Sequence, residues 1–88
     1  MRIDQLNFVS DEPTTKTLTI GDAEYQVGIK QISFADMEES RGSSVALISR
    51  AVIFEGGQTL TVEQAGKLDA AVAVKLIALI NEVNAPKP

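Results

Sequence analysis

The chain has 88 residues, a formal net charge of −4, and neither cysteine nor histidine. This length favours one small domain, and the missing residue types exclude disulfide frameworks, thiol catalysis, zinc ribbons and imidazole bases. The eight basic residues are scattered and no apolar stretch has the length of a membrane span, so we expect a soluble, non-secreted protein that binds neither nucleic acid nor membrane.

Residues 1–13 have no clear apolar period and end in a polar run that closes with Pro13. Two interpretations stay open for them: a flexible arm, or an arm with a short strand at residues 3–8. The rest, residues 14–84, shows no linker and no repeat, so it is predicted to form a single α+β domain.

A β-hairpin is predicted over residues 14–30. Residues 14–20 and 23–30 alternate with period two around Gly21 and Asp22, a pair suited to a two-residue turn. That turn places Leu18 opposite Tyr25 and Ile20 opposite Ala23. One face of the hairpin is then apolar, and helices or further strands must cover it.

Two shorter helices are predicted next. Ser33 is a candidate N-cap for a helix over residues 33–40, with Asp36 at the third helical position. Apolar residues with helical spacing then predict a helix over residues 44–53. Residues 52–54 also suit a strand because they are β-branched or aromatic, and propensity leaves that alternative open.

A long helix is predicted over residues 62–83, and it should organise the core. Thr61 and Gln64 form a capping-box pattern at its start. Asn84 suits the left-handed exit of a helix, and Pro86 prevents continuation. Residues 85–88 are predicted to be a disordered tail.

This helix also has apolar residues on the side that should face solvent. At about 100° per residue, Val74 and Ile77 lie away from the core stripe, flanked by Ala70 and Ala78. We interpret Ala70, Val74, Ile77 and Ala78 as a candidate surface for a partner or for self-association, with Ala70 allowing close approach. The alternative is that another element of the same chain covers them.

Motifs for catalysis or cofactor binding are missing from the sequence. No glycine-rich phosphate-binding pattern occurs, and the pair Gly56 and Gly57 has no adjoining lysine. Glu38 and Glu39 are adjacent on a predicted helix, so their carboxylates should point about 100° apart and not share a substrate. We therefore expect no enzyme activity, cofactor or metal.

Two arginines are secondary candidates for contacts between subunits. Arg41 and Arg50 could each form an intersubunit salt bridge, but an ordinary surface position is the competing interpretation. In that case alanine at either position should change almost nothing.

Several motifs resemble those of the tail assembly chaperones of long-tailed bacteriophages. These are an apolar helix followed by an acidic glycine turn, the run Leu60-Thr-Val-Glu-Gln-Ala65, and a spaced pattern of Leu76, Ile80 and Asn84. The preceding hairpin and the acidic stretch from Asp36 to Glu39 are also similar. The resemblance covers about residues 14–84, and its motifs are structural in kind.

The resemblance implies a non-catalytic protein of phage or prophage origin, made in the cytoplasm of the bacterial host. Its implied partners are the tape measure protein, which it keeps in solution, and the tail tube protein. It also implies a homo-oligomer that is absent from the mature virion. Two alternatives remain: a small phage or mobile-element adaptor or host-factor inhibitor, and a structural tail or head-completion protein.

Overall fold

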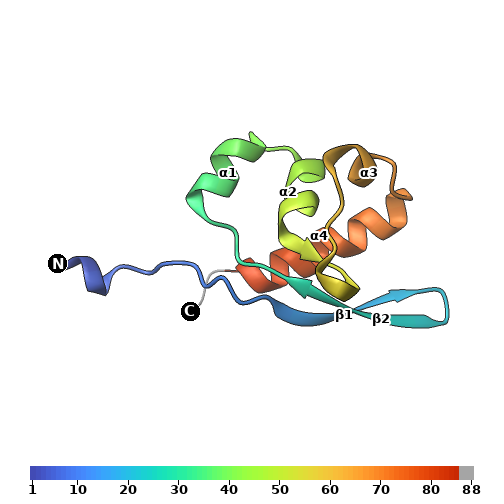
Figure 1. The fold of residues 1–88 in the computed structure, drawn as a ribbon, viewed down its shortest axis with the longest axis horizontal. Coiled ribbons are helices and arrows are strands. Elements are labelled where there is room, and N and C mark those ends of the chain that lie inside the picture. Colours follow the sequence, from blue (N-terminus) through green and yellow to red (C-terminus); the bar gives the residue numbers. More distant parts are fainter. Residues whose placement is uncertain (86–88) are drawn as a thin grey trace.

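The computed structural model describes residues 1–85 (Figure 1). A three-stranded antiparallel sheet and four α-helices confirm the predicted α+β class. The strands are β1 (Thr14–Ile20), β2 (Ala23–Ile29) and β3 (Val52–Ile53); the helices are α1 (Phe34–Ser40), α2 (Ser44–Ala51), α3 (Val62–Gly66) and α4 (Ala70–Asn84). Of the tail expected at residues 85–88, residues 86–88 lie outside the described part of the chain.

The hairpin has the predicted register. Leu18 pairs with Tyr25 and Ile20 with Ala23 across a turn in which Gly21 has a φ of 61°, a value that favours glycine. The inner half of the apolar face is buried at Leu18, Val27 and Ile29. The outer half, at Ile20 and Tyr25, is exposed. The alternating pattern predicts one apolar face that other elements cover, but at the hairpin tip this face is left exposed.

The helix predicted over residues 44–53 ends at Ala51, and residues 52–53 form β3 instead. Val52 pairs with Ile29 and Ile53 with Gly28, and the Lys30 N–H donates to the Ala51 carbonyl at 2.8 Å. The backbone of residues 52–53 finds these partners in a strand more than twenty positions away. The helical pattern of residues 44–53 contains no information about a strand so far away in the sequence, so it could not predict this pairing. The β-branched side chains of Val52 and Ile53 also favour a strand.

The single helix predicted over residues 62–83 is also wrong: α3 ends at Gly66 and α4 begins at Ala70. The Asp69 carboxylate caps the second helix by accepting from the N–H groups of Ala71 and Val72, at 2.9 and 3.4 Å. The capping box of Thr61 and Gln64 is present as predicted, but it starts only α3. Helical spacing counted from residue 62 to residue 83 therefore does not describe one continuous buried face, and Val62 at the start of α3 is exposed.

The core lies where α4 meets the sheet and α2. Helix α4 contacts β1 and β2 on one side and α2 on another, and α2 also contacts α1 and α3 (Figure 1). Ile29, Ile48, Val52 and Leu76 are the largest fully buried side chains, and they come from four different elements. Lys75 Nζ also donates to the Thr19 carbonyl at 2.7 Å, which ties α4 to β1 near the hairpin tip.

The N-terminal arm forms no strand in residues 1–13. It contains one 3-10 turn over Ile3–Gln5 and extends away from the body at the end opposite the hairpin tip (Figure 1). The Ser10 N–H donates to Gln31 Oε1 at 2.9 Å and anchors the base of the arm. The remainder of the arm is exposed.

Candidate functional site

The strip predicted on the last helix lies on α4, and it is narrower than expected. Val74 is 65% exposed, and Ala70 and Ala78 beside it are exposed too. Ile77 is half-buried and packs against the core, so the prediction that it is part of the exposed strip is wrong. The outer face of α4 around Val74 is thus one valine between alanines, and the exposed polar Asn81 lies two turns further along the same face.

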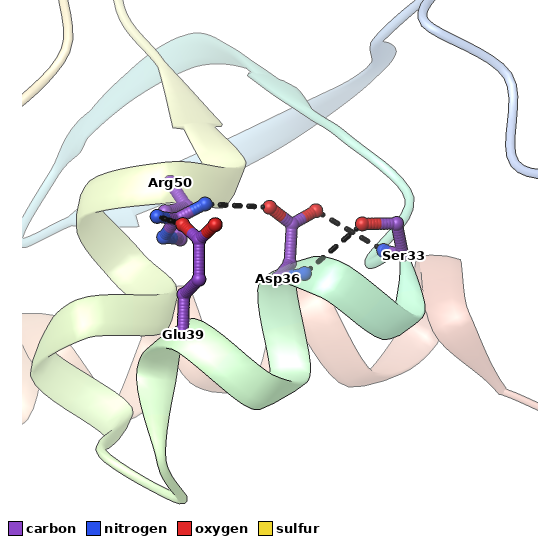
Figure 2. A network of polar contacts seen from close by, with 4 residues as sticks. All are labelled: Ser33, Asp36, Glu39 and Arg50. Carbon is purple, nitrogen blue, oxygen red and sulfur yellow. Dashed lines mark hydrogen bonds and ion pairs between the residues drawn. The ribbon is translucent and has the colours of Figure 1, made fainter.

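Arg50 pairs within its own chain. Its guanidinium donates to Asp36 Oδ1 at 2.8 Å and to the Glu39 carboxylate, so it joins α2 to α1 (Figure 2). Asp36 completes the N-terminal cap of α1, since its Oδ2 accepts from the Ser33 N–H and its own N–H donates to Ser33 Oγ. This network uses two of the five N–H donors of the guanidinium, so the ion pairs that Arg50 forms lie within its own chain.

The Asp36 carboxylate is held in its ionised form. The hydrogen bond from the Ser33 backbone N–H is the largest cause that lowers the pKa of Asp36 from its ordinary value of 3.8, and Arg50 lowers the pKa further. Burial opposes them but does not reverse the direction. The ionised carboxylate therefore stabilises the cap of α1 and the contact between α1 and α2.

Arg41 has a different role from Arg50. It ends α1 with a φ of 51° and a ψ of 39°, the left-handed conformation usual at the end of a helix, and its side chain forms no ion pair within residues 1–85. The residue closes a helix at an exposed turn. Nothing in its surroundings singles it out for a partner.

A large apolar groove lies at the hairpin tip. It has a volume of about 610 Å³ and lies between β1, the segment that follows β3, and the start of α4. We call it the tip groove. Its apolar lining consists of Leu18, Ile20, Phe54, Leu60, Leu68, Val72 and Leu76.

An adjoining hollow of about 350 Å³ extends the tip groove along the hairpin. It shares Leu18, Ile20 and Phe54 with the larger hollow and reaches Tyr25 and Glu55. Glu55 is the one charged residue that lines either hollow. Uncharged polar side chains, including Gln58 and Gln64, complete the lining. An apolar floor with amides around it suits apolar side chains from a peptide.

Local contacts set the walls of the tip groove. Gly56 and Gly57 have φ values of 79° and 78°, which allow the chain to turn back so that the Phe54 N–H donates to the Gln58 carbonyl at 2.7 Å. Ser49 Oγ donates to the Leu60 carbonyl at 2.7 Å and holds the next wall against α2. These bonds hold the backbone of residues 54–60, which supplies one side of the groove.

Sequence reasoning missed the tip groove because it placed Leu68, Val72 and Leu76 on one continuous helix. The break between α3 and α4 instead puts Leu68 in a connection, where it lines the same groove as Leu18 and Ile20 of the hairpin. A signal was available: Asp69, directly before an alanine-rich apolar run, is a favourable N-cap residue.

Comparisons of this chain with family models, curated proteins and solved structures gave no significant match. In residues 1–85 no group of three or more His, Cys, Asp or Glu side chains is placed to hold a metal ion. The helices of the same residues include none with the length and apolarity needed to cross a bilayer.

The motifs that carried the resemblance have structural roles in this fold. Leu76 and Ile80 are buried in the core, and Asn84 lies on the same side of α4 and binds the segment that leaves β2. The run from Leu60 to Ala65 contains the capping box of α3. These residues set how the helices pack, and Leu60, Gln64 and Leu76 among them also line the tip groove.

Proposed function

We propose that this protein is a non-catalytic tail assembly chaperone whose tip groove binds an apolar helix of the tape measure protein. The tip groove is the observation that carries the proposal, because it is a hollow of about 610 Å³ whose lining is mainly apolar and contains almost no charge. A long, helical, aggregation-prone client needs its apolar face covered, and an amphipathic helix lays that face into such a groove.

The motif resemblance supplies the identity of the client. A tail assembly chaperone would act in the host cytoplasm, keep the tape measure protein in solution while tail tube protein gathers around it, and leave before the virion is complete. The net charge of −4 supports this role, since an acidic shell helps a complex with an apolar client to stay in solution. Several copies on one client would add avidity.

Co-expression with the tape measure protein from the same gene cluster tests the proposal. We expect a soluble complex that elutes ahead of either protein and contains both, as measured by size-exclusion chromatography with light scattering. The variant Ile20→Asp places a charge in the tip groove and should weaken the complex about tenfold or more, the loss expected when one large apolar contact is removed.

The matched control is Phe34→Asp, which adds the same charge at an exposed aromatic residue of α1 outside the groove. It should leave the complex unchanged. Loss of the complex with Val74→Asp, but not with Ile20→Asp, would move the client to the outer face of α4. If the tape measure protein stays insoluble while this chain is folded and monomeric, the chaperone proposal is wrong and an adaptor or inhibitor is favoured. If this chain is found in purified virions, a structural component is favoured.

A further inference from the structure

The N-terminal arm displays large apolar side chains that its own domain does not cover. Ile3 is 77% exposed, Phe8 73% and Leu6 48%. Met1 and Val9 are exposed as well. So many large apolar residues on a segment outside the core form a surface that a soluble chain normally buries against a partner.

The fold of the arm gathers these side chains. The 3-10 turn over Ile3–Gln5 is closed by the Arg2 N–H, which donates to Gln5 Oε1 at 2.7 Å, and by the Leu6 N–H, which donates to the Ile3 carbonyl at 3.0 Å. Residues three apart in such a turn lie on the same side, so Ile3 and Leu6 form one apolar ridge. Phe8 follows directly. The arm therefore presents three exposed apolar side chains close together in the sequence.

The arm of one molecule is directed away from the tip groove of the same molecule. The arm and the hairpin tip lie at opposite ends of the longest dimension, which is 48 Å (Figure 1). The bond between the Ser10 N–H and Gln31 fixes the base of the arm at the far end. To reach its own groove the arm would have to reverse there and run back along the hairpin. A second copy can offer its groove without that reversal.

We propose that Ile3, Leu6 and Phe8 of one copy insert into the tip groove of a second copy. The arm supplies apolar side chains, and the groove supplies an apolar floor that the domain leaves open at Ile20 and Tyr25. Gln58 and Gln64 at the lining offer hydrogen-bonding groups to the backbone of the inserted segment. Each surface therefore matches the other in chemistry, and both belong to the same chain.

The contact joins two different surfaces, so it is heterologous and can repeat from copy to copy. Each molecule offers one arm and one groove at opposite ends. The inserted arm occupies the groove proposed for the client, so the client would have to displace it. The inference concerns the chain alone, however, and its test contains no client, so its failure and the failure of the chaperone proposal are separate results.

Light scattering on the full-length protein over a wide range of concentration tests the inference. We expect the mass to rise above the monomer value of 9.4 kDa as the concentration increases. Phe8→Asp in the arm and Ile20→Asp in the groove should each keep the protein monomeric. The matched control Phe34→Asp, an equal change at an exposed aromatic residue outside both surfaces, should associate as the original chain does.

Mixing the two monomeric variants is the decisive step. The Phe8→Asp chain keeps an intact groove and the Ile20→Asp chain keeps an intact arm, so the mixture should form a pair of twice the monomer mass and no larger species. If Ile20→Asp unfolds, Thr59→Arg places bulk and charge at an exposed residue that lines the groove and replaces it in the mixture. A wild-type chain that stays monomeric, a Phe8→Asp chain that still associates, or a mixture that stays monomeric would overturn the inference.

Discussion

The side chain of Asn84 binds the backbone of Ile32, although the two residues are 52 positions apart: Asn84 Oδ1 accepts from the Ile32 N–H at 2.7 Å. Asn84 Nδ2 donates to the Ile80 carbonyl at 2.9 Å and reaches the Lys30 carbonyl at 3.4 Å. Asn84 was expected to leave the helix in a left-handed conformation, but it is the last residue of α4 and Ala85 is extended. One amide thus joins the end of α4 to the exit of β2.

Asn84→Ala should lower the free energy of unfolding by about 1–3 kcal/mol, because the partly buried Ile32 N–H loses its acceptor. Urea unfolding followed by circular dichroism measures the change. Asn81→Ala, at an exposed position of the same helix, is the control and should stay within about 0.5 kcal/mol of the original chain. Equal effects of the two variants would mean that the hydrogen bonds of the Asn84 side chain contribute nothing to stability.

Arg50 and Arg41 should respond differently to alanine. Arg50→Ala removes the pairs with Asp36 and Glu39 and should cost about 0.5–1 kcal/mol, a cost that shrinks at high salt because the pairs are near the surface. Arg41→Ala should change stability very little. Thermal unfolding at low and high salt measures both, and a salt-independent loss at Arg50 would argue for lost packing instead of lost charge.

The stability of the fold should fall in acid partly through Asp36. Its pKa is lowered in the folded state, so its contribution is fully present above its ordinary value of 3.8 and is lost as the pH falls through the lower, folded-state pKa. Asp36→Asn removes this contribution, so the stability difference between the two proteins should be constant near neutral pH and shrink below about pH 4. Urea unfolding over a pH series measures the difference, with Glu38→Gln as the control for loss of one exposed charge on the same helix. A difference that does not vary with pH would exclude this role for Asp36.

Arg41→Gly should raise the free energy of unfolding by up to about 1 kcal/mol. A side chain in the left-handed conformation costs roughly 1–2 kcal/mol, and the greater freedom of glycine in the unfolded chain cancels part of the gain. Arg41→Ala keeps the Cβ atom and should show no gain, so the pair separates backbone strain from charge. A stability gain with alanine would assign the effect to the lost charge.

Asp69→Ala should destabilise the protein by about 1 kcal/mol through loss of the cap of α4. Asp69→Ser keeps a capping oxygen and should recover most of that loss. Chemical denaturation compares the three proteins. If the alanine variant is as stable as the original chain, the start of α4 does not depend on this cap.

Local chemistry made several features predictable from the sequence. The period-two pattern and the pair Gly21-Asp22 specify the hairpin register, because a one-residue slip would turn Leu18 and Val27 toward solvent. The caps of α1 and α3 depend on hydrogen bonds between residues three positions apart, such as Ser33 with Asp36, so they can be predicted from the sequence. The buried positions Leu76 and Ile80 follow from helical spacing in the same way.

Tertiary structure decided the features that depend on partners far apart in the sequence. Residues 52–53 form a strand because β2 lies beside them as a partner. Asn84 joins α4 to the segment after β2 because its side chain accepts a hydrogen bond from the Ile32 N–H. The tip groove required both the hairpin and the break before α4, because Ile20 and Leu68 come from these two places and line the same hollow. A sequence shows the spacing of residues along one element, but the space enclosed between elements exists only once they have packed.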